Sequence, residues 1–456
     1  MKKILLALFL GAFLMPMFAQ DDPVVKTETA EETGDKKDEK VKTGWNFGAL
    51  PAIAYDADVG FRYGALANIY NYGDGSRYPK YDHSIYVEWS RTTKGSGNNM
   101  LTWDSDKLIP GVRSFIETSL LTEQALDFYG FNGYQVNYDN ALEIGTDDFD
   151  LRNKLFYRHS RKLLRIKADF QGEIIGQEFR WLAGIGYFGN TIGAVDIDKL
   201  NEGKDPVDQL SAQSLYENYK DWGIIGADSL GGGHTMLKAG LVFDTRDNEP
   251  NPFSGIWTEL QLHYLPSFLS NTDYGYGRLV LTHRQYFTIV PDRLNLAYRL
   301  SYQSKIFGDM PFYMMPYMFN TAPKNTSNGV GGNKTVRGLM RNRVVGEGVA
   351  FANVEARYKV VKTQFLKQNF YIALSAFLDA GMVTQKYKIP EFNVDHPAIT
   401  GGFIDPDAKE TPHIGYGGGV HFVLNQNFIV AVDYGMALKE TDGVGGNMYI
   451  GLNFLF

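Results

Sequence analysis

Hydrophobic and polar residues alternate strictly in several separate segments of the chain. From 294 to 303, leucine or tyrosine at each even position alternates with Asn, Ala, Arg, Ser and Gln at the odd positions. Segments 84–90 and 352–360 repeat the pattern, as do the last ten residues, 447–456. Successive side chains of a β-strand point to opposite faces, so each segment predicts a strand with one apolar and one polar face. We therefore expect an all-β protein.

Such two-faced strands occur in soluble sandwiches and in transmembrane barrels. In a sandwich the polar face looks outward, whereas in a membrane barrel the apolar face meets lipid and the polar face lines the lumen. The chain holds 49 Gly, 28 Tyr and 30 Phe, yet its mean hydropathy is only −0.26. Many aromatic residues at mild hydropathy favour the barrel. The last strand, which carries Phe454 and ends on Phe456, also resembles the terminal strand of bacterial outer-membrane barrels.

A first count of alternating segments gives seventeen, but both chain ends lie on the same side of a barrel only when the strand number is even. The weakest division separates Asp150–Arg158 from Lys162–Gly172, because no Gly or Pro marks a turn between them. We merge these two segments into one long strand. The sequence therefore predicts a 16-stranded antiparallel transmembrane β-barrel over residues 45–456.

The connections between strands fall into two classes. Short turns are expected at 108–111, 246–253, 290–292, 362–366 and 425–427. Long loops are expected at 131–150, 191–233, 308–346 and 382–411. Outer-membrane barrels have short periplasmic turns and long external loops, so the two classes are assigned to opposite ends. Asp205 to Trp222, in a long loop, begins with Asp-Pro and predicts a short helix.

The amino-terminal segment predicts export. Lys2 and Lys3 precede the apolar run Ile4–Leu14, and a small residue follows near position 20, which is the pattern of a signal peptide over residues 1–20. Residues 21–44 are rich in charge and lack an aromatic residue before Trp45, so we expect a disordered periplasmic tether. The chain has no cysteine, which excludes disulfides and thiolate metal sites.

Candidate chemistry is sparse, and we expect no enzyme activity and no cofactor. Gly332-Asn333-Lys334-Thr335 lacks the Gly-Lys pair of a phosphate loop, and no Gly-x-Ser-x-Gly elbow is present. The eight histidines are scattered, so no metal site is predicted. The polar run 244–248 fits either a metal site or a turn stabilised by Asp and Asn side chains, and we favour the turn. The net charge of −7 does not indicate the basic surface that nucleic-acid binding requires.

Four sequence elements, in order, resemble the outer-membrane protein 85 superfamily, the BamA, TamA and FhaC type of barrel (bacterial surface antigen family). They are the opening hairpin Asn46–Asn71, the strand-turn run Asp244–Gly255 with Asp244, Arg246 and Asp247, the loop motif Val336-Arg337-Gly338, and the strand Phe377–Gly381. The resemblance rests on the four elements taken together and in this order. The resemblance covers about residues 45–456.

The resemblance implies an in-folded sixth extracellular loop, with Arg337 paired to Asp379 in the lumen. The strand phases agree, because Asp379 and Glu355 each fall on the polar face of their strand. A buried arginine needs a carboxylate partner, and a bidentate pair holds a loop in place. The alternative is a solvated Arg337. Leu339 departs from the family, which usually has an aromatic residue there.

The resemblance also implies a function in the assembly or insertion of outer-membrane proteins, without covalent chemistry. Its mechanism needs a weak seam between the first and last strands. Pro51 lacks an amide donor, which suits an edge strand, although it also suits a bulge without a function. An opened seam offers unpaired backbone to a client strand. Unlike BamA, this chain shows only the tether before the barrel, so client capture by POTRA domains is expected to be absent or supplied by a partner.

Two other functions stay open from the sequence. One is a translocation pore or passive channel plugged by the sixth loop, and the other is a structural or surface-antigen role of the long loops. The expected partners are outer-membrane lipids, unfolded outer-membrane proteins and a periplasmic protein. The expected location is the outer membrane of a Gram-negative-type envelope, with both chain termini in the periplasm.

Overall fold

A computed structural model describes residues 42–456 except 57–59, 79–80, 145–153, 207–208, 212, 227, 250, 322–327, 366–367, 425–427 and 453. The predicted signal peptide and nearly all of the predicted tether lie outside these described residues. Within the described part of the chain, no helix combines the length and apolar character needed to cross a membrane.

Strands form most of the described chain. They are β1 (Trp45–Pro51), β2 (Ala54–Asp56), β3 (Gly60–Asn71), β4 (His83–Thr92), β5 (Ser96–Ile109), β6 (Val112–Asp127), β7 (Arg158–Ile175), β8 (Phe179–Gly193), β9 (Gly231–Asp244), β10 (Gly255–Leu265), β11 (Tyr276–Val290), β12 (Leu294–Gly308), β13 (Gly348–Phe365), β14 (Gln368–Gln385), β15 (His413–Leu424), β16 (Phe428–Ala437) and β17 (Gly446–Leu452). Both β1 and β2 pair with β3, so they are two pieces of one first strand.

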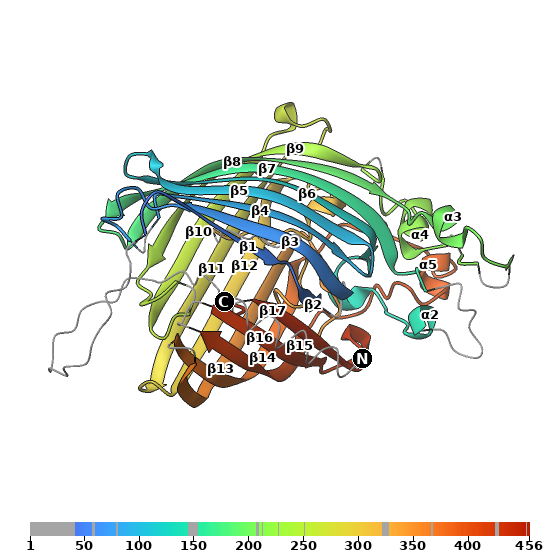
Figure 1. The fold of residues 1–456 in the computed structure, drawn as a ribbon. Coiled ribbons are helices and arrows are strands. Elements are labelled where there is room, and N and C mark those ends of the chain that lie inside the picture. The colour runs from blue at the N-terminus through green and yellow to red at the C-terminus, as the bar shows by residue number, and fades with distance from the viewer. Residues whose placement is uncertain are drawn as a thin grey trace.

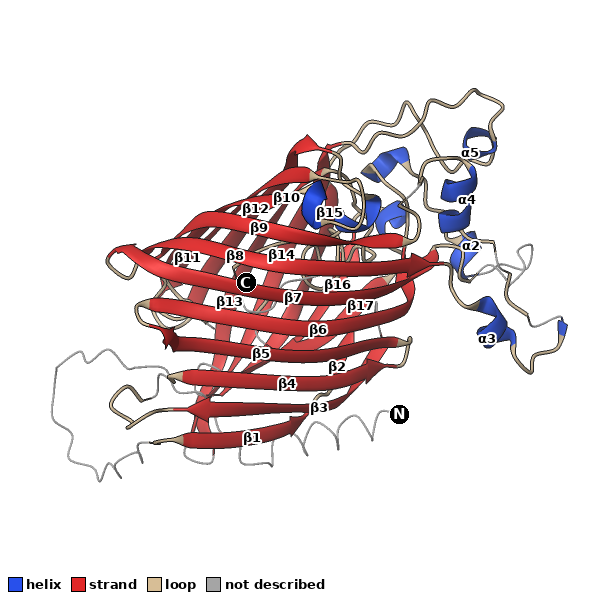
Figure 2. Cartoon of the chain, turned by 90° about the horizontal axis from the view of Figure 1, so that it is seen from above, coloured by secondary structure: helices blue, strands red, loops and turns tan. Residues whose placement is uncertain are grey.

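The sheet closes on itself. Each strand from β3 to β17 pairs antiparallel with its sequence neighbours, and β17 pairs antiparallel with β2. Counting β1 and β2 together, the result is a closed barrel of 16 strands, and this prediction is confirmed (Figure 1). Figure 2 shows the same wall from above, with its strands inclined across one another on the near and far sides.

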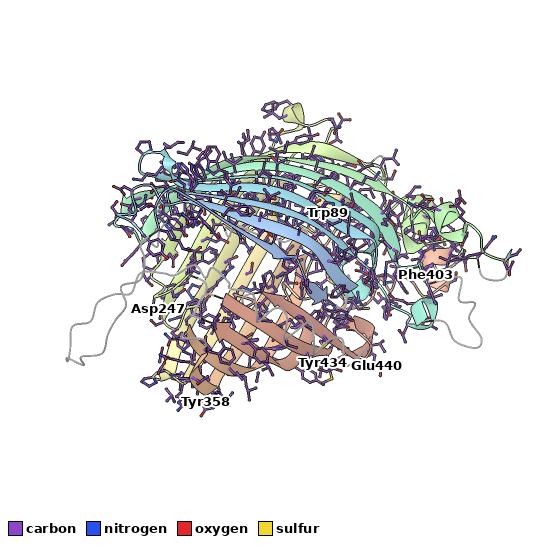
Figure 3. All side chains as sticks on the ribbon, viewed as in Figure 1. Trp89, Asp247, Tyr358, Phe403, Tyr434 and Glu440 are labelled. Carbon is purple, nitrogen blue, oxygen red and sulfur yellow. The ribbon has the colours of Figure 1, made fainter. Side chains whose placement is uncertain are left out.

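The two faces of the wall have opposite chemistry. On β4, Val87 and Trp89 are 42% and 49% exposed, whereas Glu88 and Ser90 between and beside them are buried. Strands β12 and β13 alternate in the same way, with apolar side chains outward and polar ones inward. Figure 3 shows Trp89, Tyr358 and Tyr434 on the outer wall. An apolar exterior around a charged interior is the pattern of a barrel in lipid.

The connections divide between the two ends, which we call the loop end and the turn end. At the turn end, β5–β6, β11–β12 and β15–β16 are joined by short segments, while the described residues of 128–157, 194–230, 309–347 and 386–412 lie at the loop end. The helices of the described residues gather at the loop end or beside it (Figures 1 and 2). They are α2 (Ala141–Ile144), α3 (Ile197–Asn201), α4 (Leu215–Asp221), α5 (Pro397–Thr400), and the 3-10 turns η1 (Gly133–Gln135), η4 (Ser267–Leu269), η5 (Phe312–Met314) and η6 (Glu440–Asp442).

Two local predictions need adjustment. The merged strand begins only at Arg158, because residues 154–157 form a turn; residues 150–153 lie outside the described residues. The helix predicted over 205–222 is the shorter α4, which begins after Ser214 rather than at Asp-Pro. The Ser214 side chain accepts a hydrogen bond from the Glu217 amide, and this cap fixes the start of the helix.

The predicted last strand is wrong at its end. Strand β17 stops at Leu452, and Phe454 and Phe456 are 9% and 7% exposed instead of facing lipid with Met448. The Phe454 ring lies 4.0 Å from the guanidinium carbon of Arg357, and Arg357 Nη2 donates to the Phe456 backbone oxygen at 3.0 Å. These cation–π and hydrogen-bond contacts draw the tail into the lumen, against the strand alternation.

Candidate functional site: the sixth loop, the lumen and the seam

Arg337, at the tip of the sixth loop, reaches the inner faces of β13 and β14. Its Nε and Nη2 donate to the two oxygens of Asp379 at 2.9 and 3.2 Å, and its Nη1 donates to Glu355 Oε2 at 2.7 Å. Its backbone amide also donates to Asp379, at 3.1 Å. Both carboxylates and Arg337 are at most 1% exposed. The tip of the loop is therefore held inside the barrel by a bidentate charged pair.

Further lumenal groups complete this cluster. Arg337 Nη1 lies 3.4 Å from Asp433 on β16, and the guanidinium lies 3.5 Å from the ring centre of Phe377. Arg357 donates to the free oxygen of Glu355 at 2.7 Å. Each buried charge thus has an opposite charge within contact, which a low-dielectric interior requires.

The neighbours of Arg337 explain why the motif has its composition. Val336 and Leu339 are fully buried in an apolar cluster formed by the loop and by the parts of β13 and β14 nearest the loop end. Leu339, where the sequence departs from the resemblance, is thus a packing residue of the loop. Gly338 has a φ of +91°, and a Cβ on it would lie 2.6 Å from the Met436 backbone. Only glycine fits this close approach.

The strand-turn run lies apart from the Arg337 cluster, at the turn end. Arg246 donates through Nε and Nη2 to Asp244 at 2.8 and 2.9 Å, and Arg180 on β8 also reaches Asp244, at 3.2 Å. Asp247 accepts a hydrogen bond from the Phe253 amide at 2.9 Å, which closes the turn. No group of three or more possible metal-ligating side chains occurs in the described residues.

The seam, defined as the junction of β17 with β2, is short. Only Tyr449↔Asp56 and Ile450↔Tyr55 are paired across it in the described residues. By contrast, β13 and β14 are paired from Gly348↔Gln385 to Phe365↔Gln368. Pro51 ends β1, which pairs with β3, and the described residues show no pairing between β1 and β17.

Sequence reasoning missed several partners of these groups. Arg341 and Glu123 form an ion pair between the sixth loop and β6, and Arg343 Nε lies 3.4 Å from Asp442 of the last loop. The only signal was their spacing, since Arg337, Arg341 and Arg343 crowd into one loop. Their carboxylate partners lie far away in the sequence, and strand phase alone does not select them.

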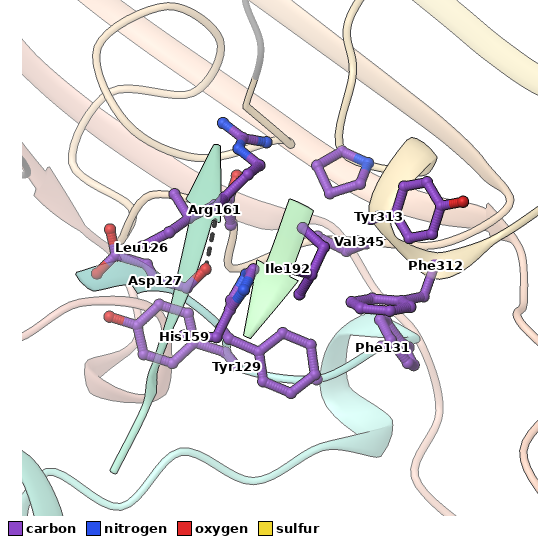
Figure 4. A pocket seen from close by; sticks show the side chains of 14 residues that line it. Leu126, Asp127, Tyr129, Phe131, His159, Arg161, Ile192, Phe312, Tyr313 and Val345 are labelled. Atoms are coloured by element: carbon purple, nitrogen blue, oxygen red, sulfur yellow. Dashed lines mark hydrogen bonds between the residues drawn. The ribbon is translucent and has the colours of Figure 1, made fainter. Parts of the chain in front are cut away.

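Sequence reasoning also missed an aromatic cluster at the loop end. Figure 4 shows Tyr129, Phe131, Phe312 and Tyr313 around a small pocket beside His159. Phe131 packs on Tyr219 of α4 and on Tyr387, so segments from four long loops meet here. The cluster packs these loops against one another over the lumen.

Comparisons with solved structures agree with this geometry. BamA from Haemophilus ducreyi lacking POTRA domains 1–3 is 13% identical with a TM-score of 0.52, and the alignment covers 90% of this chain and 70% of that chain. CdiB from Escherichia coli is 10% identical with a TM-score of 0.56, covering 92% of this chain and 66% of that one. At these identities the likeness establishes the barrel fold. A comparison with curated proteins finds no match.

The family model of the Omp85 superfamily domain matches residues 175–456. This range contains the strand-turn run, the sixth loop with Arg337, both lumenal carboxylates and the last strand of the seam. It spans more than half of the chain and the elements that carry the site. The chain therefore belongs to the Omp85 superfamily of outer-membrane β-barrels.

Proposed function

We propose that this barrel assists the insertion of other outer-membrane proteins by opening at its seam. The observation that carries the proposal is the pairing of only two residue positions between β17 and β2 in the described residues. Neighbouring strands elsewhere in the wall pair along most of their length. A junction held by so few ladder hydrogen bonds costs the least to separate.

The surroundings of the seam support this role. In lipid, a strand edge without a partner leaves backbone amide and carbonyl groups unsatisfied, at a cost of several kcal/mol for each. A client strand that pairs there removes this cost by β-augmentation. Trp45 and Phe47 on β1 are 61% and 65% exposed and point an apolar face outward next to this edge. The chemistry is pairing and release, with no covalent step.

The carboxyl-terminal tail contributes to the open edge. Phe454 and Phe456 pack inside the lumen against Arg357, so the tail does not extend β17 along the wall. In this proposal both chain termini face the periplasm, unfolded outer-membrane proteins are the clients, and a periplasmic protein delivers them. The signal peptide over 1–20 and the tether over 21–44 are part of the same proposal.

The test is the folding rate of a urea-denatured outer-membrane barrel added to liposomes that carry this protein. Liposomes with an unrelated barrel of similar size give the baseline. Because the chain has no cysteine, a disulfide can be placed across the seam in Tyr55→Cys/Ile450→Cys. We expect wild type to accelerate client folding several-fold, the oxidised variant to fall to the baseline, and reduction to restore the rate.

The matched control shares one cysteine. Val432→Cys/Ile450→Cys places a disulfide between β16 and β17, where Val432 pairs with Ile450, and leaves the seam free. This control should keep the wild-type rate when oxidised. If the oxidised seam variant also kept the wild-type rate, opening of the seam would be excluded as the mechanism.

A second candidate, a translocation pore or channel plugged by the sixth loop, has one specific observation in its favour. Arg337 holds the loop tip in the lumen on Asp379 and Glu355, as a plug requires. Conductance of planar bilayers that rises strongly after deletion of 331–346, together with a baseline rate of client folding, would favour the pore. Low conductance both before and after the deletion would exclude the pore as the function.

A further inference from the structure

A cavity opens in the lumen at the turn end, and neither Arg337 nor its partners Asp379 and Glu355 line it. Its walls come from six strands, one turn and Thr321 of the sixth loop, and include Arg113, Arg180, Asp244, Arg246, Trp257 and Arg284. The cavity has a volume of about 70 Å³. Because roughly 10–15 Å³ is enough for one water, the space suits a group of a few heavy atoms.

Positive charge exceeds its partners around this cavity. Asp244 is shared between Arg180 and Arg246, at 3.2 and 2.8 Å. Asp169, also in the wall, is bound by Lys238 at 2.5 Å. The remaining wall carboxylate, Glu249, has a side chain that is 57% exposed, and among the described residues it forms an ion pair only with Arg113, at 3.7 Å. The acidic side chains of the wall are therefore occupied or turned to solvent.

Arg284 carries the argument. It is 9% exposed, forms no ion pair with a carboxylate of the described residues, and its Nε is buried without a hydrogen-bond partner. Its guanidinium carbon lies 4.3 Å from the ring centre of Trp257, its cross-strand neighbour. On the other side its cross-strand neighbour is Arg299, another cation. The buried Glu259 of β10 acts on Arg284 electrostatically but forms no ion pair with it among the described residues. A buried charge without an ion pair, opposite a like charge, is costly unless an anion joins it.

We propose that this cavity binds a phosphate-class oxyanion, either the phosphate of a lipid headgroup or free inorganic phosphate. Arg284 is the central contact, and Arg180 and Arg246 flank it. Arginine suits this ligand because its planar guanidinium donates two parallel hydrogen bonds to phosphate oxygens. Asp244 of the strand-turn run then has a defined purpose, since it holds both flanking arginines at the wall. The proposal is independent of the seam.

Trp257 offers a direct readout, because the ligand would bind the arginine stacked on its ring. The full chain, folded in phosphate-free detergent micelles, is titrated with inorganic phosphate at constant ionic strength while tryptophan fluorescence is followed. We expect a saturable change for phosphate and none for chloride. Trp257→Phe should lose the signal, and Arg284→Met should weaken apparent affinity at least tenfold.

Arg293→Met is the matched control, because Arg293 is an exposed arginine of the turn between β11 and β12, outside the cavity. It should keep the wild-type affinity. Arg284→Lys keeps the charge without the planar fork and should bind with intermediate affinity. If Arg284→Met does not fold, the comparison of phosphate with chloride in wild type and in Trp257→Phe still decides the matter.

The two sources of phosphate are separated with vesicles. A Trp257 signal that differs between phosphatidylglycerol and phosphatidylcholine vesicles, and that added inorganic phosphate no longer changes, identifies a lipid headgroup. A signal that responds to inorganic phosphate in both lipids identifies the free ion. Equal responses to phosphate and chloride, an unchanged affinity in Arg284→Met, or no response in micelles and vesicles would overturn the proposal.

Discussion

Two of the buried arginines in the lumen, Arg337 and Arg284, have sharply different surroundings. Arg337 and Arg284 each lie over an aromatic ring, at 3.5 Å from the centre of Phe377 and 4.3 Å from that of Trp257. Arg337 binds Asp379 and Glu355 and approaches Asp433, whereas Arg284 forms no ion pair in the described part of the chain.

The difference teaches how this barrel uses interior charge. Around Arg337, protein carboxylates neutralise the guanidinium from several strands, so the charge serves to fix a loop. Around Arg284, the carboxylates of the wall are engaged elsewhere and a cavity adjoins the charge. The same side chain is therefore an anchor where its partners are built in, and a binding group where a space is left beside it.

The largest expected effect comes from Arg337→Ala, which leaves Asp379 buried without its cation and leaves Glu355 with Arg357 alone. Breaking a buried pair in this way costs about 3–5 kcal/mol. We expect a lower urea midpoint in lipid vesicles and a loss of heat-modifiable migration in gels. Arg337→Lys keeps a charge but not the bidentate geometry, so its urea midpoint should lie between those of wild type and Arg337→Ala. Wild-type migration of Arg337→Ala would show that the loop is not held by this pair.

A smaller loss of unfolding free energy is expected for Gly338→Ala. This substitution tests the position of the loop tip rather than its charge. The added Cβ meets the Met436 backbone at 2.6 Å, and the backbone has a φ of +91°. Strain of this kind costs about 1–3 kcal/mol. Gly445→Ala is the control, since Gly445 also has a positive φ, of 72°, but a Cβ there meets nothing. A loss larger than the control, measured by urea unfolding, isolates the contact with Met436.

Acid tests another ion pair of the sixth loop, the one between Arg343 and Asp442 at the loop end. Burial raises the pKa of Asp442, but hydrogen bonds and charge from His413, with Arg343, outweigh it and leave the pKa below its usual value. The folded state therefore binds fewer protons than the unfolded one, and stability falls as the pH drops below about 4. Urea midpoints between pH 7 and 3 should fall less steeply in Asp442→Asn; parallel curves would contradict this.

The smallest change is expected for Arg284→Met in the absence of phosphate. Removing an unpaired buried charge offsets the lost contact with Trp257, so the free energy of unfolding should stay within about 1 kcal/mol of wild type. The comparison of the two arginines therefore predicts a large loss of stability in Arg337→Ala and almost none in Arg284→Met. A loss as large as that of Arg337→Ala would mean that Arg284 has a structural partner and would weaken the case for an anion site.

Much of the fold was readable from the sequence because a strand has a fixed period. The alternation in 294–303 and 352–360 gave the correct inward and outward faces, and the turn and loop ends were separated correctly. The same reasoning failed at Phe454 and Phe456. Strand phase places them toward lipid, but contacts with Arg357, which is far away in the sequence, draw them inside.

The candidate site divides in the same way. The sequence pointed to Arg337, Asp379 and Glu355 together, because a family motif and the strand phases agreed. It gave no sign of Asp433, of the Arg343–Asp442 pair or of Arg284 without an ion pair, since these depend on which strands stand next to each other and how far a loop reaches into the lumen. The prediction that Arg246 and Asp247 belong to a turn fits their hydrogen bonds, but the cavity beside Arg246 was not foreseen.

The sequence by itself determined the strands, their faces and the number that closes the barrel, because period and chain parity are local or countable properties. Only the closed tertiary structure decided which strand junction has the least pairing and which buried charge has no ion pair. The shortness of the seam, the inward tail and the unpaired Arg284 arise only when distant strands meet, since pairing length and charge balance are properties of neighbours in space.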